Sequence, residues 1–172
     1  MTIVNASGDV VEQGWTTVES LEGYGPHHGI IVSPAVLLDS FDEADHVSLS
    51  HTGVRLSVED DVSEIAAYVP HLGLIELVFA QFKDGRPYST ALTLRRDYKF
   101  THELRASGDV LPDQAIFLIR SGFSSVDVPD QFTAQEFKKS LMAYSVAYQS
   151  AHDSHVSLID DLRRSTPDVA AE

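Results

Sequence analysis

Short apolar runs alternate with longer amphipathic segments along most of the chain, starting at about residue 29. The runs contain β-branched residues and few polar ones, as is typical of strands that are covered on both faces of a parallel sheet. The run 74–79 is the most apolar and is therefore expected at the centre of the sheet. The sequence predicts strands at 29–32, 54–58, 74–79, 103–107 and 125–128.

Helical periodicity follows each of these runs. Ser33 before Pro34 predicts the start of a helix that runs to about residue 46, and the spacing of Thr133 and Glu136 is that of a capping box. Three further helix starts are expected near Asp60, at Tyr88 or Ser89, and at Asp109. This alternation predicts a single α/β domain of about five βα units with a mainly parallel sheet. A flavodoxin-like sheet and a half-barrel both fit it.

The pattern changes towards both ends of the chain. We expect residues 1–28 to be an N-terminal appendage around Trp15, residues 29–150 to form the α/β domain, and residues 151–172 to form an acidic C-terminal tail. A half-barrel would leave a sheet edge to be covered. Either the segment around Trp15 or a second copy of the chain could cover it, so a homodimer is one of the open alternatives.

Composition narrows the possible partners. The chain has 172 residues and a formal net charge of −14, which repels phosphate backbones and anionic lipid headgroups, so neither nucleic acid nor a membrane is expected as a partner. The absence of Cys excludes disulfides, thiolate nucleophiles and protein-held iron–sulfur clusters. The first 14 residues lack a signal-peptide pattern, and no long apolar run follows, so we expect a cytoplasmic protein.

Familiar ligand motifs are missing from the sequence. No metal site is expected, because the eight His residues, including His27, His28, His152 and His155, do not have the spacing of a ligand set. The Gly-rich stretch 23–29 precedes the first strand and lacks the dinucleotide-binding spacing. Neither a phosphate-binding loop nor a nucleophile elbow is present.

The loop after the third strand carries the first candidate site. Ligands of parallel α/β sheets bind beyond the carboxyl ends of the strands, and this loop places two cations and a hydroxyl at a helix start. An arginine fork and free helix N–H groups suit an oxyanion. The alternative is structural, with a simple turn, a helix cap and Arg86 paired to a surface carboxylate. The candidate ligand-binding residues are Lys83, Asp84, Gly85, Arg86, Tyr88 and Ser89.

The loop after the fourth strand carries the second candidate site. Asp109 and Asp113 are expected one helical turn apart, where both could face one pocket. Arg105 lies inside a strand that should be buried, so it needs a carboxylate or an anionic ligand, and Asp109 is the expected partner. Asp109 and Arg105 are the candidate catalytic residues; the alternative gives them capping and tethering roles. The further ligand-binding candidates here are Gly108, Asp109, Asp113 and Gln114.

Four ordered blocks resemble a known family. They are FKDGRPYS at 82–89, ELRASGDVLPDQ at 103–114, RSGF at 120–123 and YSVAYQ at 144–149. Together they look like the bacterial family known as domain of unknown function 934, over about 74–149. The residues that match its motifs are Asp84, Gly85, Arg86, Tyr88, Ser89, Arg95, Leu104, Arg105, Gly108, Asp109, Asp113, Gln114, Gly122 and Tyr148.

The resemblance implies a setting and not a reaction. Members of this family look like companions of assimilatory sulfite reductase, by gene neighbourhood, and are often described as probable oxidoreductases of sulfite reduction. The chain departs from many relatives at Gln81, Pro112 and Ser124, where Lys, Arg and Asp are common. It also has Ser121 where relatives often have Cys, so a thiol mechanism cannot operate here.

Three functional hypotheses follow. The first is an accessory protein of sulfite or sulfate reduction that binds a small oxyanion at the carboxyl ends of the strands. The second is a non-catalytic module that docks on sulfite reductase or its electron donor through an acidic face. The third is a flavin or nicotinamide oxidoreductase, which only the resemblance implies.

Overall fold

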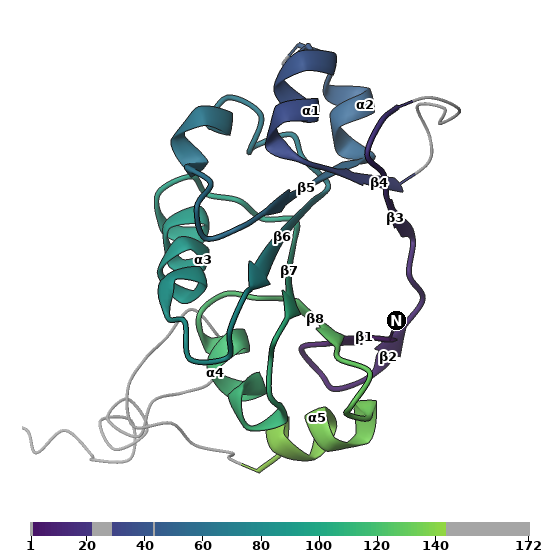
Figure 1. The fold of residues 1–172 in the computed structure, drawn as a ribbon, viewed down its shortest axis with the longest axis vertical. Coiled ribbons are helices and arrows are strands. Elements are labelled where there is room, and N and C mark those ends of the chain that lie inside the picture. Colours follow the sequence, from purple (N-terminus) through teal and green to yellow (C-terminus); the bar gives the residue numbers. More distant parts are fainter. Residues whose placement is uncertain (1, 22–28, 43, 144–172) are drawn as a thin grey trace, which may run out of the picture.

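The computed structural model describes residues 2–21, 29–42 and 44–143. These residues form one mixed α/β domain on an eight-stranded sheet, in which the strand order is β2-β1-β8-β7-β6-β5-β4-β3. The sheet is curled, and the helices lie along its outer side (Figure 1). The predicted α/β class is confirmed.

The parallel part of the sheet decides between the two predicted architectures. Its strands lie side by side in chain order: β4 (Gly29–Val32), β5 (Thr52–Leu56), β6 (Leu74–Phe79), β7 (Glu103–Gly108) and β8 (Ser125–Val128). A flavodoxin-like sheet would have a shuffled order and helices on both faces, whereas chain order with outer helices is the arrangement of a barrel. The half-barrel is therefore correct and the flavodoxin-like alternative is wrong.

The N-terminal residues are part of this sheet. Strand β1 (Thr2–Asn5) pairs antiparallel with β8 and with β2 (Val10–Val11), while β3 (Trp15–Thr17) pairs parallel with β4. The expectation of five strands is wrong, and residues 2–17 do not form a separate appendage. These three strands are two to four residues long and lack a continuous apolar run, which is why the sequence pattern missed them. The predicted tail, 151–172, lies outside the described residues.

Trp15 covers one end of the curled sheet, as its segment was expected to do. A Cβ atom placed on Gly29 would come within 3.2 Å of the indole, and one on Gly73 within 2.7 Å. The indole therefore packs closely against two positions that lack a side chain, and a side chain at Gly73 would collide with it. It lies against the N-terminal ends of β4 and β6.

Helix boundaries are confirmed where a capping side chain marks them. The Ser33 hydroxyl accepts from the Val36 amide, and Thr133 and Glu136 form the predicted capping box. The first predicted helix is instead divided in two, and only a short 3-10 helix follows Asp60. The helices are α1 (Pro34–Ser40), α2 (His46–Ser50), η1 (Val62–Ile65), α3 (Arg86–Arg96), η2 (Pro112–Gln114), α4 (Ala115–Arg120) and α5 (Ala134–Leu141).

The two faces of the central strands differ in chemistry. Successive side chains of a strand point to opposite faces. On the outer face, Val54, Ile75, Leu77, Leu104 and Val126 join one apolar core with buried residues of the helices. The alternate positions face the concave side, and several of them are charged: Arg55, Glu76, Glu103, Arg105 and Asp127.

Candidate functional site

A row of polar residues crosses the middle of the concave face. The strand register places Arg55 of β5 beside Glu76 of β6, Glu76 beside Arg105 of β7, and Arg105 beside Ser125 of β8. Glu76 and Arg105 are fully buried at 0% and 1% exposure. The centre of a parallel sheet is normally apolar, so this row needs a physical explanation. We call these four residues the concave row.

Arg55 holds one side of Glu76. Its Nη2 nitrogen lies 3.0 Å from Oε1 of Glu76 and donates a hydrogen bond to the hydroxyl of Thr17 on β3. The Arg55 side chain is 39% exposed, whereas Glu76 has no exposed surface. Arg55 is therefore the member of the concave row that meets solvent.

Arg105 is paired within its own strand. Its Nε and Nη2 donate to Oε1 of Glu103 at 3.0 and 2.7 Å, and the Ser125 hydroxyl donates to the same oxygen. The expectation of Asp109 as the partner is wrong. Glu103 stands two residues before Arg105 and so shares its face of the strand, whereas Asp109 lies beyond the end of β7.

Four buried side-chain atoms of the concave row lack hydrogen-bond partners. They are Nε of Arg55, both carboxylate oxygens of Glu76 and Nη1 of Arg105, all of them buried. Buried polar atoms are nearly always bonded in proteins, because an unpaired one costs about 1–3 kcal/mol. The concave row thus offers unused donors and unused acceptors next to each other.

Asp127 adds a half-buried carboxyl group to the same face. It lies on β8 two residues after Ser125 and lines an open hollow of about 300 Å³ together with Gly108, Val128, Pro129 and Asp130. Burial raises the pKa of Asp127, and the negative charge of Glu76 raises it further. The hollow lies at the carboxyl ends of β7 and β8, the edge of the sheet where ligands of such folds bind.

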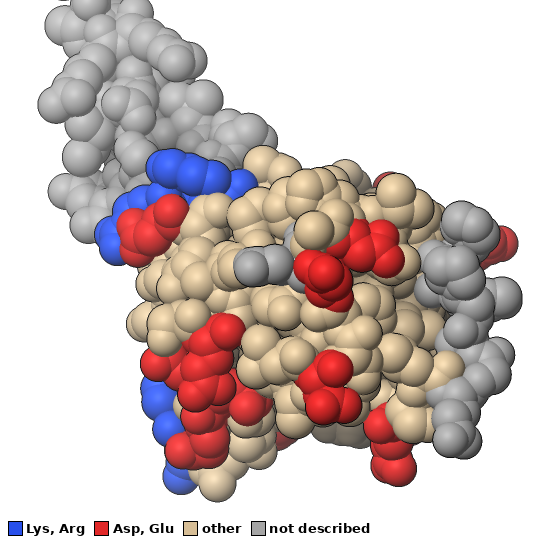
Figure 2. Space-filling model, turned by 90° about the horizontal axis from the view of Figure 1, so that it is seen from above, with Lys and Arg blue, Asp and Glu red and all other residues tan. Residues whose placement is uncertain are grey.

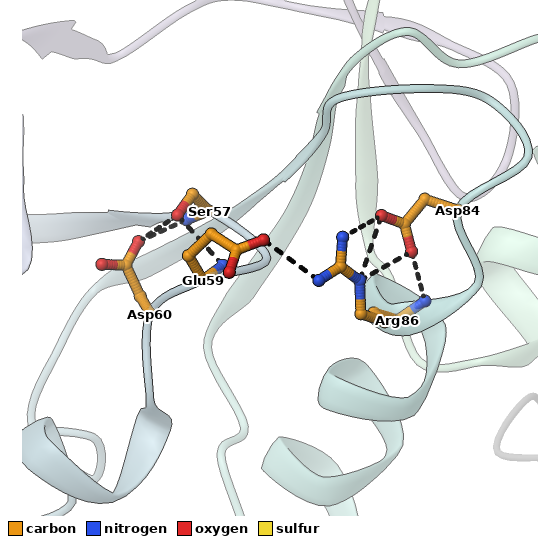
Figure 3. Close-up of polar contacts among 5 residues, drawn as sticks. All are labelled: Ser57, Glu59, Asp60, Asp84 and Arg86. Atoms are coloured by element: carbon orange, nitrogen blue, oxygen red, sulfur yellow. Dashed lines mark hydrogen bonds and ion pairs between the residues drawn. The ribbon is translucent and has the colours of Figure 1, made fainter.

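Arg86, the first predicted oxyanion ligand, is held by two carboxylates (Figure 3). Its guanidinium donates to both oxygens of Asp84, with the shortest contact 2.8 Å, and to Glu59 at 3.1 Å. These contacts raise the pKa of Arg86 and lower the pKa of Asp84. These contacts fit the structural alternative, in which Arg86 pairs with a surface carboxylate.

The start of α3 is also occupied. The helix begins at Arg86 and not at Tyr88 or Ser89, so Ser89 is an exposed residue inside its first turns. The Arg86 amide donates to Asp84, the Tyr88 amide donates to the carbonyl of Gly85, and Pro87 has no N–H group. The Asp84 carboxylate stands where an oxyanion was expected.

Tyr88 packs among aromatic rings. Its ring contacts Phe79 edge-on at 5.2 Å between centroids and lies 6.4 Å from Phe123. Burial raises the pKa of Tyr88 to about 12, with a smaller contribution from Asp113. The phenol therefore stays protonated at neutral pH.

Asp109 and Gln114 fix the neighbouring loop. The Asp109 carboxylate accepts from the Phe82 amide at 2.9 Å, and the Gln114 amide donates to the Phe82 carbonyl at 2.6 Å. Asp109 is not a helix cap, because the next helix begins only at Pro112. The structure brings the two predicted loops together, and these two side chains bind backbone at their junction.

Gly108 permits this junction. Its φ is +88°, and a Cβ atom there would lie 2.4 Å from the Phe79 carbonyl oxygen, which accepts a hydrogen bond from the Asp109 amide. Lys83 and Asp113 are exposed. Within the described residues, Lys83 has no ion-pair partner, and it stays available to an anion.

Other motif residues have architectural contacts. Arg95 donates to the carbonyls of Gly122, Phe100 and His102, and Gly122 has a φ of +103° just after α4. Ser124 bonds the backbone of Leu104. Tyr148 lies outside the described residues. Among the polar motif residues that the structure describes, Arg105 is the one with a buried donor left unused.

Arg105 was predicted from the sequence as a site residue, but the charged residues around it on the concave face were not. Arg55, Glu76, Glu103 and Asp127 each interrupt an apolar strand, and this recurrence in four successive strands was the available signal. A single charge in a strand indicates an exposed edge as readily as a site. Only the register of the sheet shows that these charges adjoin.

One end of the molecule carries several acidic patches. Seen from the end that carries α1 and α2, acidic side chains spread over the face, while basic ones lie at one margin (Figure 2). Exposed carboxylates of this part of the chain are Asp39, Asp42, Asp45, Glu59, Asp60, Asp61 and Glu64.

Neither a metal-binding cluster nor a membrane-spanning helix occurs among the described residues. In 2–21, 29–42 and 44–143, no three His, Asp or Glu side chains are placed to hold a metal ion together. His27, His28, His152 and His155 lie outside this part. No helix of the described chain has the length and apolar character needed to cross a membrane.

Comparison with known proteins gives a family and no activity. No match is found among curated proteins or among solved structures. A family model described as a bacterial protein of unknown function (DUF934) matches residues 53–159, which is more than half of the chain. The match covers β5 to β8 and both motif loops, and with them the concave row. The chain therefore belongs to the bacterial family of domain of unknown function 934.

Proposed function

We propose that this protein binds a small oxyanion on the concave face of its half-barrel, as an accessory protein of assimilatory sulfite or sulfate reduction. Arg55 and Arg105 hold the anion. The observation that carries the proposal is the pair of buried guanidinium N–H groups, Nε of Arg55 and Nη1 of Arg105, that lack an acceptor. An anionic oxygen is the strongest acceptor for such groups.

The geometry favours the concave row over the Arg86 loop. At Arg86 the guanidinium already binds two carboxylates, and the helix N–H groups nearby have acceptors. An anion there would have to displace Asp84. In the concave row, by contrast, an anion would accept hydrogen bonds from donors that have no acceptor. Its binding would therefore remove the free-energy penalty of these buried, unsatisfied N–H groups.

We propose two routes by which an anion reaches the concave row. Arg55 is 39% exposed at one end, and Asp127 faces the open hollow at the other. The row itself is buried, so a bound anion is held away from water, where charge-assisted hydrogen bonds are stronger. The hollow beside Asp127 has a volume of about 300 Å³, which is enough to admit an approaching ligand of a few heavy atoms.

The sulfur chemistry comes from the family setting. Sulfite and sulfate are small oxyanions, and assimilatory reduction handles both. The concave row can bind such anions without any catalytic step, and Asp127 supplies a carboxyl group for proton transfer if there is one. A flavin or nicotinamide oxidoreductase stays a prediction from the family resemblance.

A docking module is the second candidate, and the acidic surface favours it. Among the charged side chains seen at the α1–α2 end, carboxylates outnumber cations (Figure 2). Such a face steers a basic partner towards it and orients the encounter. In this account, charge reversal at Asp42, Asp45 and Asp61 weakens binding to sulfite reductase or its electron donor, while variants of the concave row do not.

A thermal-shift panel with sulfite, sulfate and phosphate tests the proposed function. A ligand at about 100 times its dissociation constant adds about 2.7 kcal/mol, or roughly 5 to 11 °C in melting temperature for a chain of this size. We expect such a shift for the wild type. Arg55→Lys keeps a positive charge beside Glu76 but removes the fork and its Nε donor, so it should lose the shift.

Arg86→Lys is the matched control, because it makes the same change in the other candidate loop. The oxyanion should raise the melting temperature of this variant by as much as it raises that of the wild type. Loss of the shift in Arg86→Lys but not in Arg55→Lys would move the site to the loop. No shift with any oxyanion would contradict the proposal and favour the docking module, to be tested by pull-down of sulfite reductase.

A further inference from the structure

We propose that the concave site selects oxyanions that still carry a proton, such as hydrogensulfite, hydrogenphosphate or hydrogencarbonate, over fully deprotonated ones such as sulfate. This inference rests on the proposed function and names its ligand class. The residue that makes the selection is Glu76. It lies between the two arginines in the register of the sheet.

Glu76 has a carboxylate oxygen without a partner. Its side chain has 0% exposure, and Oε1 is ion-paired with Arg55 at 3.0 Å without a formed hydrogen bond, whereas Oε2 has neither an ion-pair partner nor a hydrogen-bond donor. An ionised carboxylate only accepts hydrogen bonds. An O–H group on the ligand would therefore satisfy Glu76, while other oxygens of the same ligand accept from Arg55 and Arg105.

A fully deprotonated anion lacks that O–H group. It would satisfy the two guanidinium groups but bring a bare oxygen against the Glu76 carboxylate in a buried setting. Two negatively charged oxygens in contact repel each other strongly where water is excluded. Oε2 of Glu76 would also stay without a hydrogen-bond donor, which costs free energy at a buried acceptor.

The other charged groups of the face do not cancel this selection. Glu103 on β7 is engaged by Arg105 and Ser125. Asp127 on β8 is a further carboxyl group on the same side, and burial raises its pKa. The neighbouring positions Thr17 on β3 and Asn5 on β1 are uncharged. The charged side chains that the structure describes on the concave face are therefore two cationic ones, Arg55 and Arg105, and three acidic ones, Glu76, Glu103 and Asp127.

Isothermal titration with three anions tests the selection on the full-length wild type. Hydrogensulfite is the probe at about pH 6, methanesulfonate is a monoanion of similar shape without an O–H group, and sulfate is the deprotonated dianion. We expect hydrogensulfite to bind at least about tenfold more tightly than either of the others. Its affinity should fall as the pH rises to about 8, where it loses its proton.

Glu76→Gln provides the reversal. The amide of Gln can donate, so this variant should lose the preference for hydrogensulfite and gain affinity for methanesulfonate and sulfate. Circular dichroism and thermal melting establish that the variant is folded. If it is not, the comparison of hydrogensulfite with methanesulfonate in the wild type still decides the question.

The outcomes separate this inference from the proposed function. Equal binding of hydrogensulfite, methanesulfonate and sulfate would overturn the selection while leaving an oxyanion site in place. Binding of none of these three anions, and none of phosphate in the thermal-shift panel, would overturn the proposed function and the selection together. Tighter binding of sulfate in Glu76→Gln than in the wild type would support the selection directly.

Discussion

At the scale of single residues, most of the motif side chains are used to build the molecule. Asp109 and Gln114 bind the backbone of Phe82, Arg95 binds three carbonyl groups, and Arg86 is tied to Asp84 and Glu59. Concave-face residues are different, because some of their polar atoms have no partner. A residue with a buried polar atom that bonds to nothing in the protein is the better candidate for binding a ligand.

Asp127 should make stability depend on pH. Its raised pKa means that the folded protein holds this proton more tightly than the unfolded chain, whose reference value is 3.8. Stability is therefore lost as the pH rises above that value through the folded pKa, and it stays lost at neutral pH. Asp127→Asn imitates the protonated form, so it should melt at a higher temperature than the wild type at pH 7.

Thermal melts of both proteins between about pH 7 and pH 4 check this prediction. The advantage of Asp127→Asn should shrink as the pH falls, because the wild type then gains the same proton. A variant that melts below the wild type at pH 7 would contradict it and indicate that the ionised carboxylate stabilises the fold.

Gly108→Ala should be strongly destabilising. The positive φ costs an Ala residue about 1 kcal/mol or more, and the added Cβ would collide with the Phe79 carbonyl. We expect a fall in melting temperature of at least about 4 °C. Gly85→Ala is the matched control, since nothing lies within 4 Å of a Cβ there and its φ is −85°. Equal melting temperatures for the two variants would contradict the geometry of the β7 loop.

At the scale of elements, the N-terminal strands hold the half-barrel together. Strand β1 covers the edge of β8, and its residues Ile3 and Val4 are each only 1% exposed. By contrast, Val10 of β2 is 63% exposed. The N-terminal segment therefore contributes to the core although its sequence does not indicate a strand.

Ile3→Ala measures that contribution. Removing a fully buried Ile side chain should cost about 2–5 kcal/mol, read as a lower midpoint in urea unfolding. Val10→Ala removes apolar surface from the same hairpin at an exposed position and should change stability by less than about 0.5 kcal/mol. If the two variants unfold at the same denaturant concentration, the strand pairing of β1 with β8 is not an important part of the fold.

Sequence patterns predicted the elements that carry their own signal. The strand 74–79 is a continuous apolar run and was predicted with its correct bounds, and the cap at Thr133 has its Glu136 partner, so the start of that helix was predicted correctly. Strand β1 depends on pairing with distant β8, which no local pattern reveals. The same limit applies to the site: Arg105 was recognised as a buried cation, but its neighbour Glu76 adjoins it only through the register.

At the scale of the whole molecule, curvature and charge act together. The sheet is curled (Figure 1), and the strand register places the charged positions of β5 to β8 side by side on one face. The outer surface is acidic, and the chain carries a net charge of −14, which repels anions at long range. An anion site in such a protein has to rely on short-range hydrogen bonds from buried cations, which the concave row provides.

This balance also suits a protonated ligand. A monoanion is repelled less by an acidic surface than a dianion is, and added salt weakens the long-range repulsion but not the buried contacts. The acidic exterior and the buried Glu76 carboxylate thus favour the same ligand class. Both features belong to the molecule as a whole, because neither loop of the sequence motif contains them.

The most direct test of the central claim is to observe the arginine side chains while an oxyanion binds. In a nitrogen-15 NMR titration with hydrogensulfite at about pH 6, the side-chain N–H resonances of Arg55 and Arg105 should shift with saturation, and that of Arg86 should stay in place. The backbone amides of Glu76 and its strand neighbours should shift with them. If the resonance of Arg86 moves while those of Arg55 and Arg105 do not, the anion binds in the α3 loop and the concave row is structural.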